Sequence, residues 1–143
     1  MKYILIVDDD KHEHILFRYV IQRLYSDIEV SGYLSCSEMV QKLNDLTPTL
    51  IFLDINIPME SGIECLRQMR TKPHLAHTPI IIYSNDWDDE LVLKAYSAGA
   101  TYYLPKTIAV NEMENLFIWM IQTCETHLTV PFSEFLLDPQ SFK

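Results

Sequence analysis

The chain has 143 residues, of which 48% are hydrophobic, so it can form one domain with a substantial core. An excess of acidic over basic residues gives a net charge of −9, which argues against binding of nucleic-acid phosphates by this chain. None of its 3 glycines belongs to a nucleotide-binding loop of the GxGxxG or GxxxxGK type, and no apolar run is long enough to span a membrane.

The cysteines Cys36, Cys65 and Cys124 are odd in number, far apart and without a CxxC pair. This pattern favours free thiols in a reducing cytoplasm. Residues 1–4 have neither the long apolar core nor the small-residue cleavage site of a signal peptide. We therefore expect a cytoplasmic protein that is not inserted in a membrane.

Strand-like and helix-like stretches alternate along the chain. Short runs rich in apolar and β-branched residues predict strands at residues 3–7, 28–34, 50–53, 79–83 and 101–104. Helical spacing of apolar residues predicts helices at residues 15–24, 36–47, 62–71, 89–98 and 110–126. Five strand–helix repeats predict an α/β fold in which helices cover both faces of a parallel sheet.

Several of the predicted helices have recognisable ends. Ser35 and Ser61 each precede a glutamate by three residues, which is the spacing of a capping box at a helix start. Pro48 is expected to stop the second helix, and Gly99 suits the carboxyl end of the fourth.

Polar side chains follow four of the five predicted strands. Asp8 and Asp9 follow the first strand, Asp54 the third, Ser84 the fourth and Lys106 the fifth. The carboxyl ends of parallel strands meet at one edge of the sheet, where such folds bind ligands. Three carboxylates there need a compensating cation, and an all-oxygen site suits Mg²⁺. A carboxylate can also accept a phosphoryl group covalently.

Taken in order, these residues resemble the receiver domain of two-component response regulators. The matching marks are the pair Asp8-Asp9, the run Asp54-Ile-Asn-Ile-Pro-Met-Glu-Ser-Gly62, Ser84, and the run Gly99-Ala-x-x-Tyr-Leu-Pro-Lys106. The resemblance covers about residues 1–125, and the ordered set is far more specific than any single motif. It implies a flavodoxin-like, doubly wound five-stranded parallel sheet of order 2-1-3-4-5.

The resemblance also implies a chemistry. Asp54 would accept a phosphoryl group from the phosphohistidine of a sensor histidine kinase or a phosphotransfer protein. Mg²⁺ would be bound by Asp9, Asp54 and the main-chain carbonyl of Asn56, and by Asp8 through water. Lys106 would contact the phosphoryl oxygens. We expect a phosphoacceptor that assists its own phosphorylation and dephosphorylation, and not an enzyme with a separate substrate.

Further positions are expected to act as a switch or to set a rate. Ser84 would swing toward the phosphoryl group, and Tyr103 would follow by turning inward. Asn56 and Asp86 match the variable positions that tune dephosphorylation in this family. The alternative explanation of Tyr103 is an aromatic residue that stabilises an edge strand.

Two departures from the family pattern favour an alternative function. Thr107 follows Lys106 where the family usually has a proline, and Asn85 follows Ser84 where a small residue is usual. The alternative is a pseudo-receiver, a protein-interaction module that is not phosphorylated. An aspartyl phosphatase fits less well, because residues 8–12 lack its hydroxyl or valine position. A flavodoxin-like electron carrier lacks its phosphate loop.

Single residues in this set carry little weight by themselves. Lys106 alone would be an ordinary surface lysine, and Ser84 alone a helix cap. His12 and His14 follow the acidic residues but lie about 200° apart on a helix, so they do not share a face. We expect both to be surface histidines.

The last predicted helix is apolar around its whole circumference at residues 116–121. One explanation is that the tail covers it with its apolar residues Phe132, Phe135, Leu136 and Leu137. The other is a homodimer through Ile118 and Trp119. The sequence leaves both open.

We divide the chain into a receiver domain at residues 1–127 and a C-terminal extension at residues 128–143 that is too short for a second domain. Output is therefore expected through a downstream protein partner or through phosphorelay.

Overall fold

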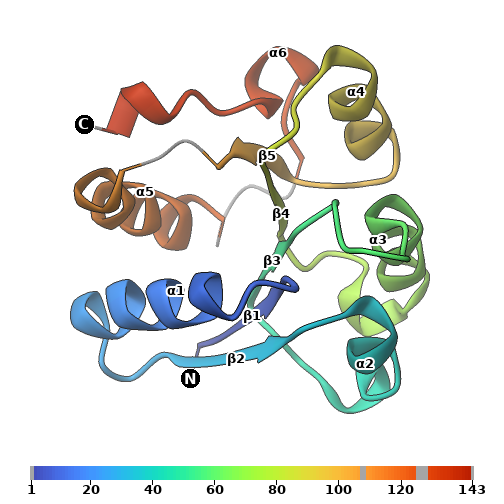
Figure 1. Cartoon of the computed structure of the whole chain (residues 1–143), viewed down its shortest axis with the longest axis horizontal. Helices are drawn as coiled ribbons and strands as arrows, with labels where there is room; N and C mark the ends of the chain where they lie inside the picture. The colour runs from blue at the N-terminus through green and yellow to red at the C-terminus, as the bar shows by residue number, and fades with distance from the viewer. Residues whose placement is uncertain (1, 107–108, 125–128, 143) are drawn as a thin grey trace.

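The computed structural model describes residues 2–106, 109–124 and 129–142 of the chain (Figure 1). Thr107 and the end of the predicted last helix lie outside the described residues. The five strands are β1 (Tyr3–Val7), β2 (Glu29–Tyr33), β3 (Leu50–Leu53), β4 (Ile80–Ser84) and β5 (Tyr102–Pro105). They form one parallel sheet of order β2-β1-β3-β4-β5, which confirms the predicted topology.

Helices cover both faces of this sheet (Figure 1). One face is covered by α1 (Lys11–Leu24) and α5 (Val110–Thr123), and the other by α2 (Cys36–Val40), α3 (Gly62–Thr71) and α4 (Asp89–Ser97). The central strands are apolar throughout because both of their faces are buried. In β1, Ile4 and Ile6 pack toward α1 and α5, whereas Leu5 and Val7 pack toward α2 and α3.

The predicted helix ends are mostly confirmed. The hydroxyls of Ser35 and Ser61 each accept a hydrogen bond from the amide three residues later, at 3.1 and 3.2 Å. Gly99 follows α4 with a φ of 102°, in the left-handed region that favours glycine. The second helix is shorter than predicted, because α2 ends at Val40 and a 3₁₀ turn, η1 (Leu43–Asp45), follows. This tighter turn keeps Leu43 buried with α2.

His14 is buried, so its prediction as a surface residue is wrong. Its Nε2 donates a hydrogen bond of 2.7 Å to the main-chain carbonyl of Asp8. Gly32 on β2 makes room for the ring, since a Cβ at Gly32 would lie 1.8 Å from His14 Nδ1. The sequence pattern missed this because the space comes from a residue 18 positions later in the chain.

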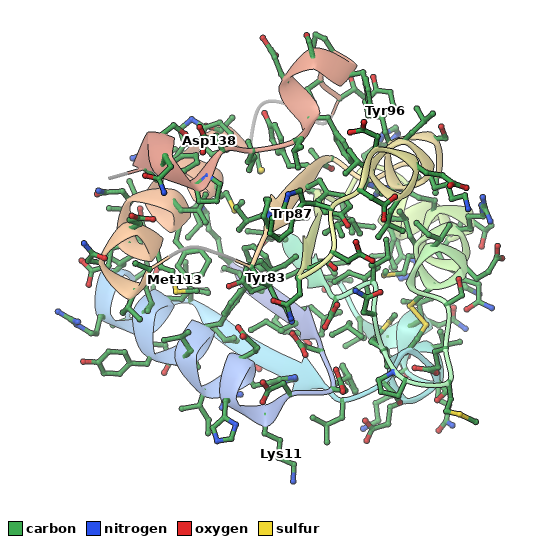
Figure 2. The ribbon with its side chains drawn as sticks, turned by 45° about the horizontal axis from the view of Figure 1, so that its top comes forward. Lys11, Tyr83, Trp87, Tyr96, Met113 and Asp138 are labelled. Atoms are coloured by element: carbon green, nitrogen blue, oxygen red, sulfur yellow. A yellow bond between two sulfur atoms is a disulfide. The ribbon has the colours of Figure 1, made fainter. Side chains whose placement is uncertain are left out.

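The prediction of three free thiols is also wrong. Cys36 at the start of α2 and Cys65 on α3 form a disulfide, with Cα atoms 6.1 Å apart (Figure 2). They are 29 residues apart in the chain, and the packing of α2 beside α3 brings them together. Cys124 remains a free, buried thiol.

The C-terminal segment packs back on the domain. It contains α6 (Phe132–Phe135) and the 3₁₀ turn η3 (Pro139–Phe142). Phe135 and Leu137 are buried, and Trp119 of α5 packs its ring against Phe142 at 5.4 Å. The tail therefore covers part of the apolar last helix, through Leu137 and Phe142. The predicted cover is wrong for the other residues, because Phe132 and Leu136 are exposed and Phe135 packs on the opposite face of the sheet. No described helix is both long and apolar enough to cross the bilayer.

We predict a specific pattern of thiol reactivity. Burial raises the pKa of Cys124 to about 12, so little reactive thiolate forms at neutral pH. In a colorimetric thiol assay, the native protein should show no fast-reacting thiol. Unfolding without reductant should expose one thiol, and unfolding after reduction should expose all 3. Three thiols without reductant would show that Cys36 and Cys65 are not bonded.

We also predict that Gly32→Ala destabilises the fold by about 1–3 kcal/mol, because the added methyl overlaps the ring of His14. Urea unfolding measures this change. The matched control is His14→Ala, which removes the ring: in that background Gly32→Ala should cost little. An equal cost in both backgrounds would contradict the overlap.

Candidate functional site

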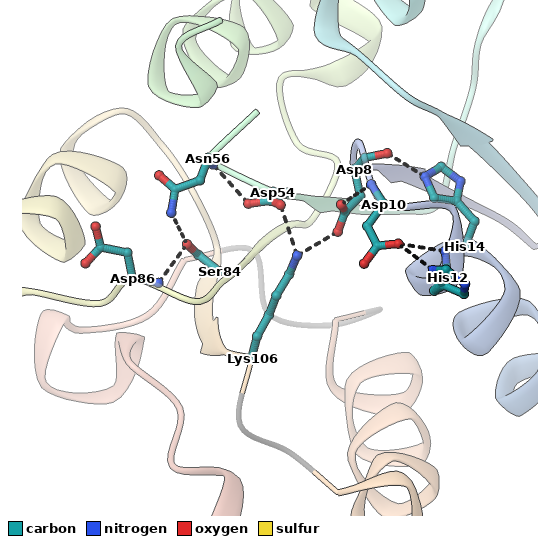
Figure 3. A network of polar contacts seen from close by, with 9 residues as sticks. All are labelled: Asp8, Asp10, His12, His14, Asp54, Asn56, Ser84, Asp86 and Lys106. Carbon is teal, nitrogen blue, oxygen red and sulfur yellow. Dashed lines mark hydrogen bonds and ion pairs between the residues drawn. The ribbon is translucent and has the colours of Figure 1, made fainter. Parts of the chain in front are cut away.

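The four strand ends meet at one edge of the sheet as predicted (Figure 3). Asp8 and Asp9 follow β1, Asp54 follows β3, Ser84 ends β4 and Lys106 follows β5. Asp8 is 2% exposed and Asp54 6%, whereas Asp9 is exposed. Parallel register places these residues together, because β1 pairs with β3, β3 with β4 and β4 with β5.

The centre of the site is a lysine between two carboxylates. Lys106 Nζ donates to Asp8 Oδ2 at 2.8 Å and to Asp54 Oδ2 at 2.9 Å (Figure 3). The Lys106 side chain is only 8% exposed, and its main-chain amide donates to the carbonyl of Ser84 at 2.8 Å. This hydrogen bond ties the main chain of Lys106, directly after β5, to the end of β4, and its ammonium lies 5.3 Å from the centre of the Tyr83 ring.

Burial and charge act against each other in this group. Burial raises the pKa of Asp8 even though Lys106 opposes the shift. Burial by itself would lower the pKa of Lys106, but its hydrogen bonds to Asp8 and Asp54 outweigh this and raise it. The lysine therefore stays charged at neutral pH. One ammonium does not neutralise two buried carboxylates, so the site favours a second cation.

The acidic residues are close enough to share a metal ion. One carboxylate oxygen each from Asp8, Asp9 and Asp54 lies within 4.8 Å of the others. An oxygen-only donor set with few protein ligands is typical of Mg²⁺ sites. The residues present therefore fit a divalent cation of this kind.

The loop after β3 connects Asp54 to Ser84. The amide of Asn56 donates to Asp54 Oδ1 at 2.9 Å, and its side-chain Nδ2 donates to the Ser84 hydroxyl at 3.1 Å. Ser84 is fully buried, and its hydroxyl also accepts from the amide of Asp86 at 3.1 Å (Figure 3). Asn85, a departure from the family pattern, is exposed.

Two features of this loop depend on close packing. A Cβ at Gly62 would lie 2.4 Å from the Cα of Ile55, so only glycine allows α3 to begin this close to the loop. The Glu60 carboxylate accepts from the amides of Cys36 and Ser37 at 2.8 and 2.9 Å, which connects the loop to α2. The sequence analysis assigned no role to Glu60.

Tyr103 on β5 is fully buried, and its hydroxyl donates to the main-chain carbonyl of Asp86. Burial raises the pKa of Tyr103 to about 12, so the phenol is neutral. The ring thus already lies inward beside Ser84.

Glu13 on α1 is a residue near the site that the sequence analysis missed. It is half-buried, its Oε2 has no hydrogen-bond partner among the described residues, and burial raises its pKa. The nearby charges of Lys106, Asp8 and Asp54 also influence that pKa. Its position four residues after Asp9, on the first turn of α1, was the available signal. Asp10, in contrast, caps α1 by accepting from the amide of His12 at 2.9 Å.

Comparisons with known proteins agree with this geometry. The model of the response regulator receiver domain matches residues 4–117. The chain is 27% identical to the response regulator Rcp1 of Synechocystis over 132 residues, which cover 87% of each protein. It is 33% identical to the transcriptional regulatory protein BtsR of Escherichia coli K12 over 78% of this chain.

Coverage differs among these relatives. The chain spans 44% of the length of BtsR and 41% of the sensory transduction protein LytT of Bacillus subtilis. Among solved structures, the phosphorylated cyanobacterial phytochrome response regulator RcpA has a TM-score of 0.77 and 21% identity, covering 90% of this chain and 99% of RcpA. The BeF3-activated DrrB receiver domain has a TM-score of 0.70 and 27% identity, with coverages of 85% and 98%.

The topology, the group formed by Asp8, Asp54 and Lys106, and a family match over most of the sequence all agree. The chain belongs to the receiver-domain family of response regulators.

Proposed function

We propose that Asp54 accepts a phosphoryl group from the phosphohistidine of a sensor histidine kinase or a phosphotransfer protein. The observation that carries this proposal is the 2.9 Å contact of Lys106 Nζ with Asp54 Oδ2 at the end of β3. A carboxylate held beside a buried cation and a buried hydroxyl is suited to phosphoryl transfer, which depends mainly on positioning and charge stabilisation.

In the proposed step, an oxygen of Asp54 forms a bond to phosphorus while the bond between phosphorus and the donor histidine nitrogen breaks. The histidine nitrogen keeps the electron pair of that bond. Lys106 Nζ donates one of its hydrogen bonds to a phosphoryl oxygen in place of a carboxylate oxygen. The Ser84 hydroxyl donates a hydrogen bond to a second phosphoryl oxygen. The chain is a phosphoacceptor that assists its own phosphorylation and dephosphorylation, and it is not an enzyme with a separate substrate.

Mg²⁺ is the proposed cofactor. Asp9, Asp54 and the main-chain carbonyl of Asn56 would hold the ion directly, and Asp8 through water. The ion would neutralise negative charge on the phosphoryl group. The close approach of the three carboxylates supports this assignment.

The signal is proposed to leave the site through Ser84 and Tyr103, toward a downstream protein partner or the next protein of a phosphorelay. Asn56 and Asp86 contact Ser84 in the structure, which supports their proposed role in setting the lifetime of the phosphoryl group. A homodimer through Ile118 and Trp119 remains a further proposal.

The proposed place of action is the cytoplasm. Disulfides are rare in reducing compartments, so the Cys36–Cys65 bond is the observation against this location.

Phosphorylation is tested with a small-molecule phosphodonor and Mg²⁺. Intact mass spectrometry should show one added phosphoryl group that hydroxylamine removes, and Asp54→Ala should show none. Ser84→Ala, which keeps Asp54 and Lys106, should still be phosphorylated but more slowly. No addition to the unaltered protein would favour the pseudo-receiver.

Metal binding is tested by urea unfolding with and without Mg²⁺. At a concentration 100 times its Kd, Mg²⁺ should stabilise the protein by about 2.7 kcal/mol. Asp9→Asn should abolish most of this gain. The matched control Asp10→Asn loses the same charge but keeps a capping side chain, so its gain should persist. Equal gains in both variants would contradict the assignment of Asp9.

A further inference from the structure

The C-terminal segment at residues 130–142, here called the docked tail, extends the sheet beyond β5. The amide of Leu137 donates to the carbonyl of Tyr103 at 2.8 Å, and Leu136 forms a parallel bridge with Tyr103. Phe135 packs into the core beneath α2, α3 and α4, whereas Leu137 packs into the core beneath α1 and α5. The tail is thus joined to β5 by one isolated parallel bridge and one main-chain hydrogen bond, and its side chains enter the cores on both sides of the sheet.

Aromatic contacts hold the tail at its first anchor. The ring of Phe135 is fully buried, 5.0 Å from the ring of Tyr96 on α4 and 6.2 Å from that of Tyr103. The Tyr96 hydroxyl donates to the carbonyl of Val130 at 2.8 Å. Figure 2 shows Tyr96 where α4 meets α6. Phe132 also packs on Tyr96, at 5.1 Å, but is 47% exposed.

A second anchor lies on α5. The ring of Phe142 packs 5.4 Å from that of Trp119, and the side-chain amide of Asn115 donates to the Phe142 carbonyl at 3.1 Å. The tail thus contacts α4, β5 and α5 together, on the side of the domain that carries the edge strand (Figure 1).

Tyr103 connects this tail to the phosphorylation site. Its ring lies beneath Phe135, and its hydroxyl donates to the carbonyl of Asp86. The amide of Asp86 donates to the Ser84 hydroxyl, and Asn56 joins Ser84 to Asp54. A continuous series of contacts therefore runs from the tail to the phosphoacceptor.

We propose that the docked tail, through Phe135, holds Tyr103 in its buried position and thereby favours phosphorylation of Asp54. Phe135 is a positioning residue: it contacts Tyr103, and Tyr103 keeps the Asp86 carbonyl and the Ser84 hydroxyl in place.

This inference rests on the proposed function, in which phosphorylation selects the inward Tyr103. The coupling is then reciprocal: the docked tail raises the affinity of the site for a phosphoryl group, and a phosphoryl group makes the tail open less often. The docked tail therefore favours the phosphorylated form of the domain and does not inhibit phosphorylation.

Beryllofluoride with Mg²⁺ serves as the phosphoryl mimic, applied to the full chain. Amide hydrogen exchange at Leu137 reports tail opening, because that amide bonds to the Tyr103 carbonyl. Exchange should slow about 5- to 150-fold when beryllofluoride binds, the usual range for coupled sites. Faster exchange would show an inhibitory tail and overturn the proposal, as would unchanged exchange.

Variants separate positioning from general stability. Phe135→Ala should weaken beryllofluoride binding within the same 5- to 150-fold range. Phe135→Leu should restore most of the affinity. The matched control Phe132→Ala removes a tail aromatic ring that packs on Tyr96 and leaves the contact of Phe135 with Tyr103. This variant should therefore keep its affinity for beryllofluoride. Tyr103→Phe keeps the ring but loses the bond to Asp86, so Leu137 exchange should no longer respond to beryllofluoride. Equal affinities for Phe135→Ala and Phe132→Ala would overturn the proposal.

An independent measurement needs no phosphoryl mimic. Tetranitromethane modifies accessible tyrosines, and peptide mass spectrometry locates the modified residue. Tyr103 should be protected in the unaltered protein and in Phe132→Ala, and modified in Phe135→Ala. Protection in all three would overturn the positioning role.

The two proposals fail in distinguishable ways. If the unaltered protein does not bind beryllofluoride with Mg²⁺, the proposed function fails and the regulatory role fails with it. If it binds with an affinity that Phe135→Ala does not change, only the role of the tail fails.

Discussion

The ammonium of Lys106 lies between two nearly inaccessible carboxylates, and much of the site depends on this contact. Asp8 and Asp54 come from β1 and β3, and Lys106 from β5, on the far side of β4. The group exists only if all four strands are in register. Because two buried carboxylates share one lysine, the site keeps excess negative charge, which is the physical basis for the proposed binding of a further cation. The proposed phosphoryl transfer depends on the same excess of negative charge, because it requires the bound cation.

Around this group, the positions of the site residues depend on close packing at two glycines as well as on charge. His14 supports the Asp8 carbonyl because Gly32 leaves room for its ring. Gly62 lets α3 begin close to Ile55, directly after Asp54. The Glu60 carboxylate joins the same loop to α2 through the amide of Cys36. The loop that carries Asp54 is thus held from several directions, as a site that depends on positioning requires.

Hydrogen bonds and ring contacts continue from the site to the C-terminal tail. Ser84, Asp86 and Tyr103 form a connected path from Asp54 to the outer strand, and the tail closes over the end of that path. The surface formed by α4, β5 and α5 is therefore occupied in this structure by the chain's own residues. A partner that uses this surface would have to bind beside the tail or displace it.

The sequence pattern by itself predicted the parallel sheet and the principal site residues, and the resemblance to the receiver family supplied the strand order. Continuous apolar runs indicate buried strands, and a polar residue after such a run lies at the carboxyl edge, so Asp54, Ser84 and Lys106 could be placed from pattern alone. Only the tertiary structure decided the Cys36–Cys65 bond, the burial of His14, the place of Glu13 and the docking of Phe135. Each of these depends on the distance between side chains of separate elements, and a periodic pattern along one element contains no information about that distance.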